Sequence, residues 1–181
     1  LDVVHLPFVH HNTIGRGNRT VVNGPYSEWD CKLTDCNRLD IWVKNEVDTG
    51  QVAVGARDLT RPDRRPFLQF QFPNVWHNWI GESTRIVAAF APVDDEHTMM
   101  YVRFYQNMVR VPVLRELFNL VARPANGVIL RQDKGVVASQ RPRRSELKMG
   151  ELLIPGDLPI IEYRKRRQEL IEQAAQQAPT G

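Results

Sequence analysis

The sequence lacks the features that mark membrane proteins, cysteine-rich proteins and one large class of hydrolase. Its apolar runs fall far short of the ~20 residues that a membrane-spanning helix needs, and no secretory signal segment is visible. We therefore expect a cytoplasmic protein with no membrane partner. Its two cysteines, Cys31 and Cys36, are too few for a zinc ribbon or an iron–sulfur cluster, and we expect both thiols to be reduced. The zinc-hydrolase segment H-E-x-x-H does not occur.

The charge of the chain is also unremarkable for nucleic-acid binding. The 181 residues carry a net charge of only +3, with 42% hydrophobic and 25% charged residues, as expected for one globular domain. A nucleic-acid-binding surface usually places aromatic residues among its basic ones. The basic clusters lack that pattern, so we expect no nucleic-acid partner and interpret them as solvated surface or as a docking site for an acidic electron donor. They comprise Arg141, Arg143, Arg144, Lys148 and residues 164–167.

The most informative residues lie at the start of the chain. Asp2, His5 and His10 form the pattern D-x2-H-x4-H, and His11 follows directly. Neutral imidazole suits iron, copper, nickel or zinc as a ligand. If this segment is helical, Asp2 and His5 share a face, and Pro7 could bring the two histidines together by interrupting the helix. The spacing leaves two interpretations open, a divalent-metal site or histidines that cluster without a common ligand.

This pattern resembles the mononuclear iron motif of Rieske-type non-haem iron oxygenases, which hydroxylate or demethylate organic, often aromatic, compounds. Two later segments resemble the same family in the same order, RIVAAFAPVDDEHTMMYVRF at residues 85–104 and NGVILRQDKGVVASQ at residues 126–140. The resemblance implies that His5, His10 and the distant Asp133 bind Fe(II) as a facial triad. It also implies that Asp2 is a catalytic residue that links the iron to the Rieske cluster of a neighbouring subunit. The alternative for Asp133 is a surface carboxylate beside Lys134.

The resemblance further implies partners that this chain does not encode. The cluster-binding motifs C-x-H and C-x-x-H do not occur, so we expect residues 1–181 to be one catalytic domain whose [2Fe-2S] Rieske domain lies upstream of Leu1. Electrons would come from NAD(P)H through a reductase or a ferredoxin. A homotrimer and a small hydrophobic substrate, aromatic or polycyclic, are expected. Whether the reaction is mono-oxygenation, dioxygenation or demethylation stays open.

The order of the predicted elements indicates an α+β fold, with an antiparallel sheet followed by long helices. The family implies a helix-grip fold with an apolar cavity between the sheet and the C-terminal helix. Apolar alternation and helical periodicity place strands at residues 36–47, 67–72, 84–91 and 98–106, and helices at residues 2–13, 112–121, 126–140 and 158–178. The last helix begins at an N-cap residue, Asp157, ahead of Pro159.

The remaining candidates are placed by position alone. Asn12 lies two residues after His10 and could border the iron, whereas His11, His77 and His97 are interpreted as neighbours or turn residues. We expect the substrate to contact Asn12, Phe104, Phe118, Asn126 and Ile129. A rival interpretation is a helix-grip module that binds a hydrophobic ligand without redox activity. It accounts for the cavity but not for a carboxylate and two histidines in the family's order, and one iron per chain would distinguish the two.

Overall fold

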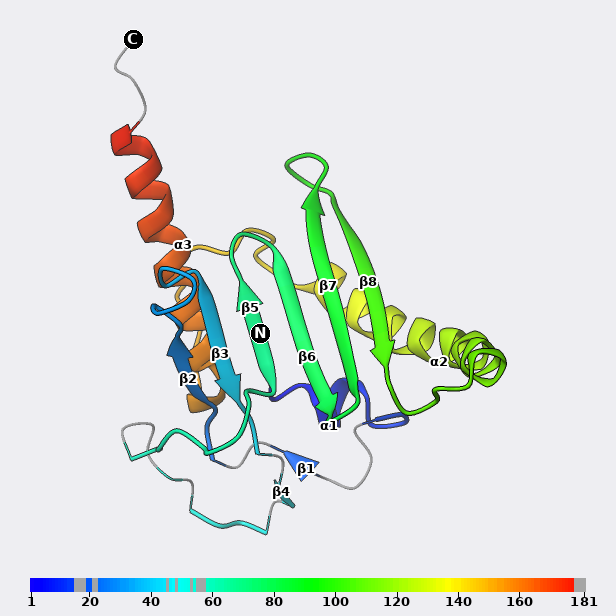
Figure 1. Cartoon of the computed structure of the whole chain (residues 1–181). Coiled ribbons are helices and arrows are strands. Elements are labelled where there is room, and N and C mark those ends of the chain that lie inside the picture. Colours follow the sequence, from blue (N-terminus) through cyan, green and yellow to red (C-terminus); the bar gives the residue numbers. More distant parts are fainter. Residues whose placement is uncertain are drawn as a thin grey trace.

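A six-stranded antiparallel sheet forms the centre of the computed structural model, which describes residues 1–14, 19–20, 23–44, 46–47, 49–52, 54 and 58–177 (Figure 1). In spatial order its strands are β2 (Tyr26–Trp29), β3 (Arg38–Trp42), β5 (Leu68–Gln71), β6 (Val75–Gly81), β7 (Thr84–Pro92) and β8 (Thr98–Gln106). Two short strands pair separately, β1 (Arg19–Thr20) with β4 (Glu46–Val47). The described residues also form three α-helices, α1 (Leu6–Val9), α2 (Pro112–Ser139) and α3 (Leu158–Gln177). The α+β prediction is confirmed, and the arrangement is consistent with a helix-grip fold.

The register of the central strands explains the alternation seen in the sequence. Leu39 lies opposite Phe70, and Ile41 lies opposite Leu68, so these four side chains project from the same face of the sheet. All four are buried, and Leu39 and Ile41 are 0% exposed. The predicted strands at residues 67–72, 84–91 and 98–106 are confirmed with small differences in length, and β7 pairs with β8. The single strand predicted at residues 36–47 is wrong in extent, because β3 ends at Trp42 and Glu46–Val47 form β4, which pairs with β1 outside the central sheet.

The helices cover this apolar face of the sheet. In α3, the Tyr163 ring packs edge-on against Phe70 at 5.1 Å between ring centroids and stacks on Phe72 at 5.2 Å. In Figure 1, α3 lies at the end of the sheet formed by β2 and β3, and α2 passes behind β7 and β8. The N-terminal segment joins the same core, because Val3 is buried among the central strand residues. The core therefore ties both ends of the chain to the sheet.

The two helices predicted at residues 112–121 and 126–140 form one helix, α2, so the predicted break is wrong. Pro124 lies inside it. A proline removes one backbone hydrogen bond and bends a helix, but long helices on either side can hold the chain helical through it. Figure 1 shows this bend, since the green start of α2 is seen nearly end-on while its yellow remainder runs across the view. Among the described residues, no helix combines the length and apolar character needed to cross a bilayer.

The first helix is much shorter than the predicted range of residues 2–13. α1 has four residues and begins at Leu6, and Pro7 lies in its first turn, where the missing N–H costs nothing. The final helix begins as predicted, after a 3₁₀ turn at Pro155–Asp157. Asp157 does not cap it in the expected way, since its carboxylate accepts a hydrogen bond from the Ile154 amide at 3.0 Å. The last predicted residue, Ala178, lies outside the described residues.

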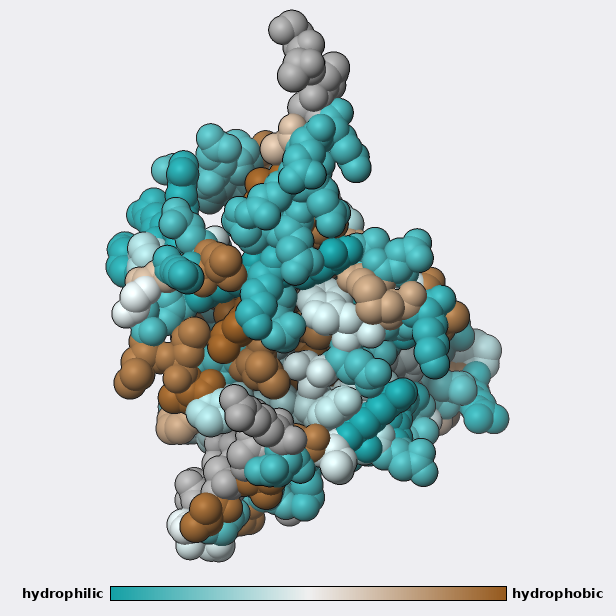
Figure 2. Space-filling view, turned by 90° about the vertical axis from the view of Figure 1, so that its left-hand side faces the viewer, coloured by the Kyte–Doolittle hydropathy of each residue, from teal (hydrophilic) through white to brown (hydrophobic). Residues whose placement is uncertain are grey.

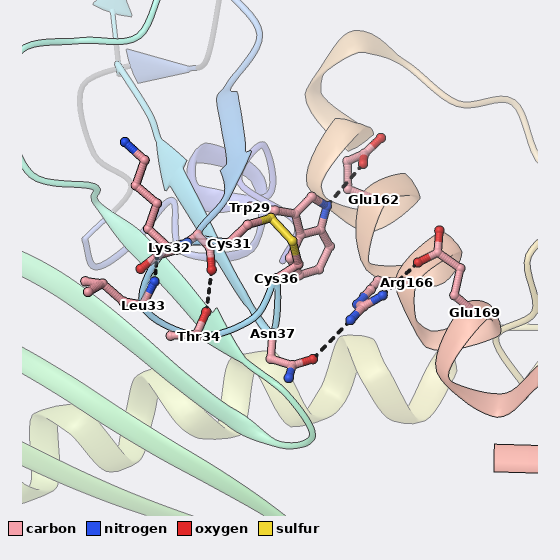
Figure 3. The surroundings of a disulfide bond; sticks show 11 residues. Trp29, Cys31, Lys32, Leu33, Thr34, Cys36, Asn37, Glu162, Arg166 and Glu169 are labelled. Carbon is pink, nitrogen blue, oxygen red and sulfur yellow. Dashed lines mark hydrogen bonds and ion pairs between the residues drawn. A yellow bond between two sulfur atoms is a disulfide. The ribbon is translucent and has the colours of Figure 1, made fainter. Parts of the chain in front are cut away.

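The prediction of reduced thiols is wrong in this structure, because Cys31 and Cys36 form a disulfide (Figure 3). The turn between β2 and β3 brings them together. Asp35 and Cys36 adopt positive φ values of 50° and 59°, which reverses the chain. The strand and loop that flank the disulfide contact α3, because Trp29 Nε1 donates to Glu162 at 3.4 Å and an Arg166 nitrogen donates to Asn37 Oδ1 at 3.3 Å.

The basic residues of α3 are only partly a solvated surface, which corrects the prediction for residues 164–167. Arg164 is 8% exposed, donates to Ser145 Oγ at 3.0 Å and forms an ion pair with Glu151. Arg166 forms an ion pair with Glu169 at 3.0 Å. Burial of a guanidinium is tolerated because a carboxylate and a hydroxyl satisfy it. Figure 2, which faces the side of the molecule that carries α3, shows a largely hydrophilic outer surface along this helix.

Candidate metal centre

Two side chains from the N-terminal segment and one from α2 meet at one point. The carboxylate oxygen Oδ1 of Asp133 lies 3.0 Å from Nε2 of His10 and 3.8 Å from Nε2 of His5. One candidate ligand atom from each residue lies within 4.8 Å of the other two. The structure therefore brings together the three residues that the sequence singled out.

The short helix α1 sets the two histidines at the required separation. The His5 carbonyl accepts hydrogen bonds from the amides of Phe8 and Val9, and the His10 amide donates to Leu6 at 3.1 Å. This single turn places the two imidazole rings 5.2 Å apart at an angle of 68°. The two rings are thus neighbours in an edge-to-face arrangement.

The segment before α1 is anchored by packing. Val3 is 7% exposed, and the next residue, Val4, lies against Gly156 in the 3₁₀ turn before α3. A Cβ built on Gly156 would collide with Cγ2 of Val4, so this close approach requires glycine. The contact fixes the backbone of the residue that immediately precedes His5.

Asp2 contacts His5 mainly through its backbone. The Asp2 carbonyl oxygen lies 3.0 Å from His5 Nδ1. Its carboxylate accepts hydrogen bonds from the backbone amides of Val4 at 2.8 Å and His5 at 3.2 Å, and lies 3.7 Å from His5 Nδ1. The carboxylate is 49% exposed. It therefore shapes the turn that leads into α1 and remains accessible from outside the domain.

Two residues beside the triad were missed by sequence reasoning. Oε1 of Gln132 lies 2.9 Å from Nδ1 of His10, and the Thr13 hydroxyl donates to the same Oε1 at 3.3 Å. Gln132 directly precedes Asp133, and this adjacency was the available signal. On an ideal helix, consecutive side chains diverge by about 100°, so periodicity gave no reason to direct both at one ring.

The other histidines lie outside the triad. His11 is exposed, with Nδ1 3.1 Å from the Phe8 carbonyl. His97 contacts Asp94 across the β7–β8 turn at 2.8 Å, and the pKa of Asp94 is lowered by hydrogen bonds from the Glu96 amide and the His97 side chain. His77 lies on β6, where burial and then the positive charges of Arg85 and Arg38 lower its pKa.

The predicted substrate-contacting residues lie on three elements. Asn126 and Ile129 are half-buried and lie seven and four residues before Asp133, so they share its face of α2. Phe104 is half-buried on β8. Asn12 is exposed, and Phe118, 36% exposed, lies in the part of α2 before Pro124.

Two open hollows of the described surface lie away from the triad. One is at the ends of β6, β7 and β8, and the other is in the loop at residues 61–66. None of the predicted substrate-contacting residues lines either of them. The first is lined by Trp79, Glu82, Ser83, Thr84, Arg85, Tyr105, Gln106 and Asn107.

The chemistry of the three donors suits a divalent transition metal. Two imidazole nitrogens and one carboxylate oxygen form the facial-triad set that non-haem Fe(II) enzymes use, with the remaining positions left open. The site is closed on one side and accessible on the other, because the side chain of His10 is 2% exposed while those of His5 and Asp133 are 30% and 40% exposed. The residues present therefore fit a mononuclear iron.

No curated protein and no solved structure matches the chain. One family model does, described as the vanillate O-demethylase oxygenase C-terminal domain, and it matches residues 1–173. The match includes the histidine pair, the full sheet, α2 with Asp133, and most of α3. The chain therefore belongs to the vanillate O-demethylase oxygenase C-terminal domain family, within the Rieske-type oxygenases.

Proposed function

We propose that this domain is the catalytic domain of an oxygenase that uses a mononuclear Fe(II), held by His5, His10 and Asp133, to oxidise a hydrophobic organic substrate. The observation that carries the proposal is the convergence of these three side chains from α1 and α2. The helical periodicity of the two segments does not require these three side chains to lie together. Two imidazole nitrogens and one carboxylate oxygen around a common point are the donor set of a mononuclear iron site, in which all three share one cation.

The residues of this chain would position the iron and leave one side of it accessible to the substrate. Bound Fe(II) would supply the activation of O2 at its open coordination positions. His10, which is buried, holds one side of the site, and the half-exposed His5 and Asp133 leave the other side accessible to substrate. Ile129 and Asn126 lie on the same face of α2 as Asp133, so they are the best placed of the predicted substrate contacts.

Electrons must reach this site from outside the chain. We propose that a [2Fe-2S] Rieske cluster delivers them, after reduction by NAD(P)H through a reductase or a ferredoxin. Asp2 is the proposed connection, because its exposed carboxylate lies beside the backbone of His5 and 3.7 Å from the His5 ring. A cytoplasmic location would give such a protein access to its electron donor.

We propose a homotrimer as the working assembly. Apolar side chains on the first part of α2 are exposed, and a patch of this kind usually marks a protein interface. A second copy of the chain is the proposed partner, since a subunit that receives electrons from its neighbour needs that neighbour at a fixed position. The exposed residues are Val113, Leu114, Leu117, Phe118, Leu120 and Val121.

Iron content tests the proposed function directly. The protein, loaded with Fe(II) without oxygen and then desalted, should retain one iron per chain. Asp133→Asn should retain far less, because a neutral amide binds a divalent cation more weakly than a carboxylate does. Glu116→Gln is the matched control, because it removes a carboxylate from the exposed part of the same helix. It should retain iron like the unsubstituted protein.

A protein that retains no iron but binds an apolar fluorescent ligand would be a carrier, and the oxygenase proposal would be wrong. Asp133→Asn with full iron occupancy would remove Asp133 from the ligand set. With iron retained and a Rieske donor present, turnover of aromatic ethers and of polycyclic hydrocarbons would separate demethylation from ring hydroxylation.

A further inference from the structure

Two consecutive residues of α2 contact the two nitrogens of one imidazole. Gln132 Oε1 lies 2.9 Å from His10 Nδ1, and Asp133 Oδ1 lies 3.0 Å from His10 Nε2. The His10 side chain is only 2% exposed, so water has almost no access to either nitrogen. The state of the ring is therefore decided by these two contacts.

The acceptor at Nδ1 determines which nitrogen carries the proton. A neutral imidazole has one N–H and one lone pair, and their positions follow from the partner of each nitrogen. Oε1 of Gln132 is a carbonyl oxygen and can only accept, and the Thr13 hydroxyl, 3.3 Å away, donates to it. The Thr13 hydroxyl also lies 3.2 Å from the His10 carbonyl, which ties this residue to the same turn. Nδ1 of His10 therefore carries a hydrogen, which leaves the lone pair of Nε2 available to a metal that Asp133 also binds.

His5 reaches the same state by a different route. Its Nδ1 lies 3.0 Å from the backbone carbonyl of Asp2, so the lone pair of its Nε2 is likewise available to a metal shared with Asp133. The acceptor for His5 is backbone and no side-chain substitution removes it. The acceptor for His10 is a side chain, which makes its contribution measurable.

We infer that Gln132 is a positioning residue, which selects the Nδ1–H tautomer of His10 and fixes the ring so that Nε2 faces the metal. The inference rests on the proposed function, since it concerns the same iron site. Outer-shell partners of metal-binding histidines commonly hold the ring and its tautomer, and their loss lowers metal affinity about 10–100-fold. Thr13 supports the role by orienting the amide of Gln132.

The test combines two readouts on the full chain. The first is the 15N chemical shifts of the His10 ring in metal-free protein, which show whether Nδ1 carries a hydrogen. The second is the dissociation constant for Fe(II) under anaerobic conditions. Gln132→Leu should lose the Nδ1–H tautomer and bind Fe(II) about 10–100-fold more weakly. Gln132→Glu keeps an acceptor at the same place and should restore both the tautomer and most of the affinity, which a merely structural role would not require.

Two further variants complete the set. Gln140→Leu is the matched control, an exposed glutamine at the end of the same helix, and it should change neither readout. If Gln132→Leu does not fold, Gln132→Met, which is similar in length and flexible, replaces it. Unchanged tautomer and affinity in a folded Gln132→Leu or Gln132→Met protein would overturn the inference.

The two readouts also separate this inference from the proposed function. If the unsubstituted protein binds no Fe(II), the proposed function fails. In that case the tautomer in metal-free protein still decides whether Gln132 sets the ring of His10. If the protein binds Fe(II) but the tautomer is Nε2–H before and after substitution, the iron site stands and the role of Gln132 is wrong.

Discussion

Asp133 and His10 lie far apart in the sequence, one in α2 and the other in the N-terminal segment, yet Asp133 Oδ1 is 3.0 Å from Nε2 of His10. The contact joins α2 to the turn that follows α1. His10 is buried and Asp133 is half-exposed, so the pair lies where the core of the domain meets solvent. A metal bound there is held from the protein side and reached from the other side.

His5→Ala should remove iron with little effect on the fold. The His5 side chain is 30% exposed and lies outside the strand core, so its loss should cost about 1 kcal/mol or less of the free energy of unfolding. His11→Ala is the matched control, because its side chain is exposed, lies outside the triad and follows His10 directly. Iron analysis and thermal unfolding followed by circular dichroism are the measurements. Full iron occupancy in His5→Ala would remove His5 from the site.

Asp2→Asn should keep the iron and lose most of the turnover. The amide oxygen of asparagine can still accept the hydrogen bonds from the Val4 and His5 amides, so the turn is preserved and only the charge is lost. Asp2→Ala also loses those hydrogen bonds and should bind iron less tightly. Product yield in a single turnover with a pre-reduced Rieske cluster is the measurement. A yield equal to that of the unsubstituted protein would show that the Asp2 charge plays no part in electron delivery.

Gly156→Ala should destabilise the domain and weaken iron binding together. The added methyl group collides with Val4 Cγ2, and such overpacking costs about 1–3 kcal/mol of the free energy of unfolding. Val4 directly precedes His5, so its displacement should shift the ligand.

Gly135→Ala provides the contrast to Gly156→Ala. Its added Cβ meets nothing within 4 Å, and the residue lies inside α2. Removing a helical glycine should raise stability by about 0.5–1 kcal/mol without changing iron affinity. Urea unfolding and Fe(II) titration measure both quantities. Equal effects of the two substitutions would contradict the packing argument.

His77 should make stability depend on pH in a defined window. Its pKa in the folded protein is lowered from the ordinary 6.5, first by burial and then by Arg85 and Arg38. The unfolded state therefore binds a proton at a higher pH than the folded state does. The stabilising contribution of neutral His77 is complete above pH 6.5 and is lost as the pH falls from 6.5 through the lowered pKa of the folded protein.

The difference in unfolding free energy between the protein and His77→Gln isolates this contribution. As the pH falls below 6.5, the free energy of unfolding of the unsubstituted protein should decrease relative to that of His77→Gln. An NMR titration of the His77 ring gives the folded-state pKa, and Arg85→Met should raise that pKa by removing one positive charge. A difference that does not vary with pH would contradict the expected shift.

Several elements could be predicted because local sequence determines them. The alternation in residues 67–72 predicts β5, since a strand with one buried face repeats every second residue. The alternation in residues 84–91 and 98–106 predicts β7 and β8 for the same reason. The break predicted near Pro124 was wrong, because the helical segments on either side outweigh one missing hydrogen bond.

The sequence by itself predicted the donor set, since two imidazoles and a carboxylate in the family's order predict a particular class of metal. Only the tertiary structure decided that Gln132 and Asp133 contact opposite nitrogens of His10, and that Val4 packs against Gly156 next to the proposed ligand His5. These contacts join residues far apart in the chain. They form only because the sheet, α2 and α3 pack together, and local sequence patterns do not predict that packing.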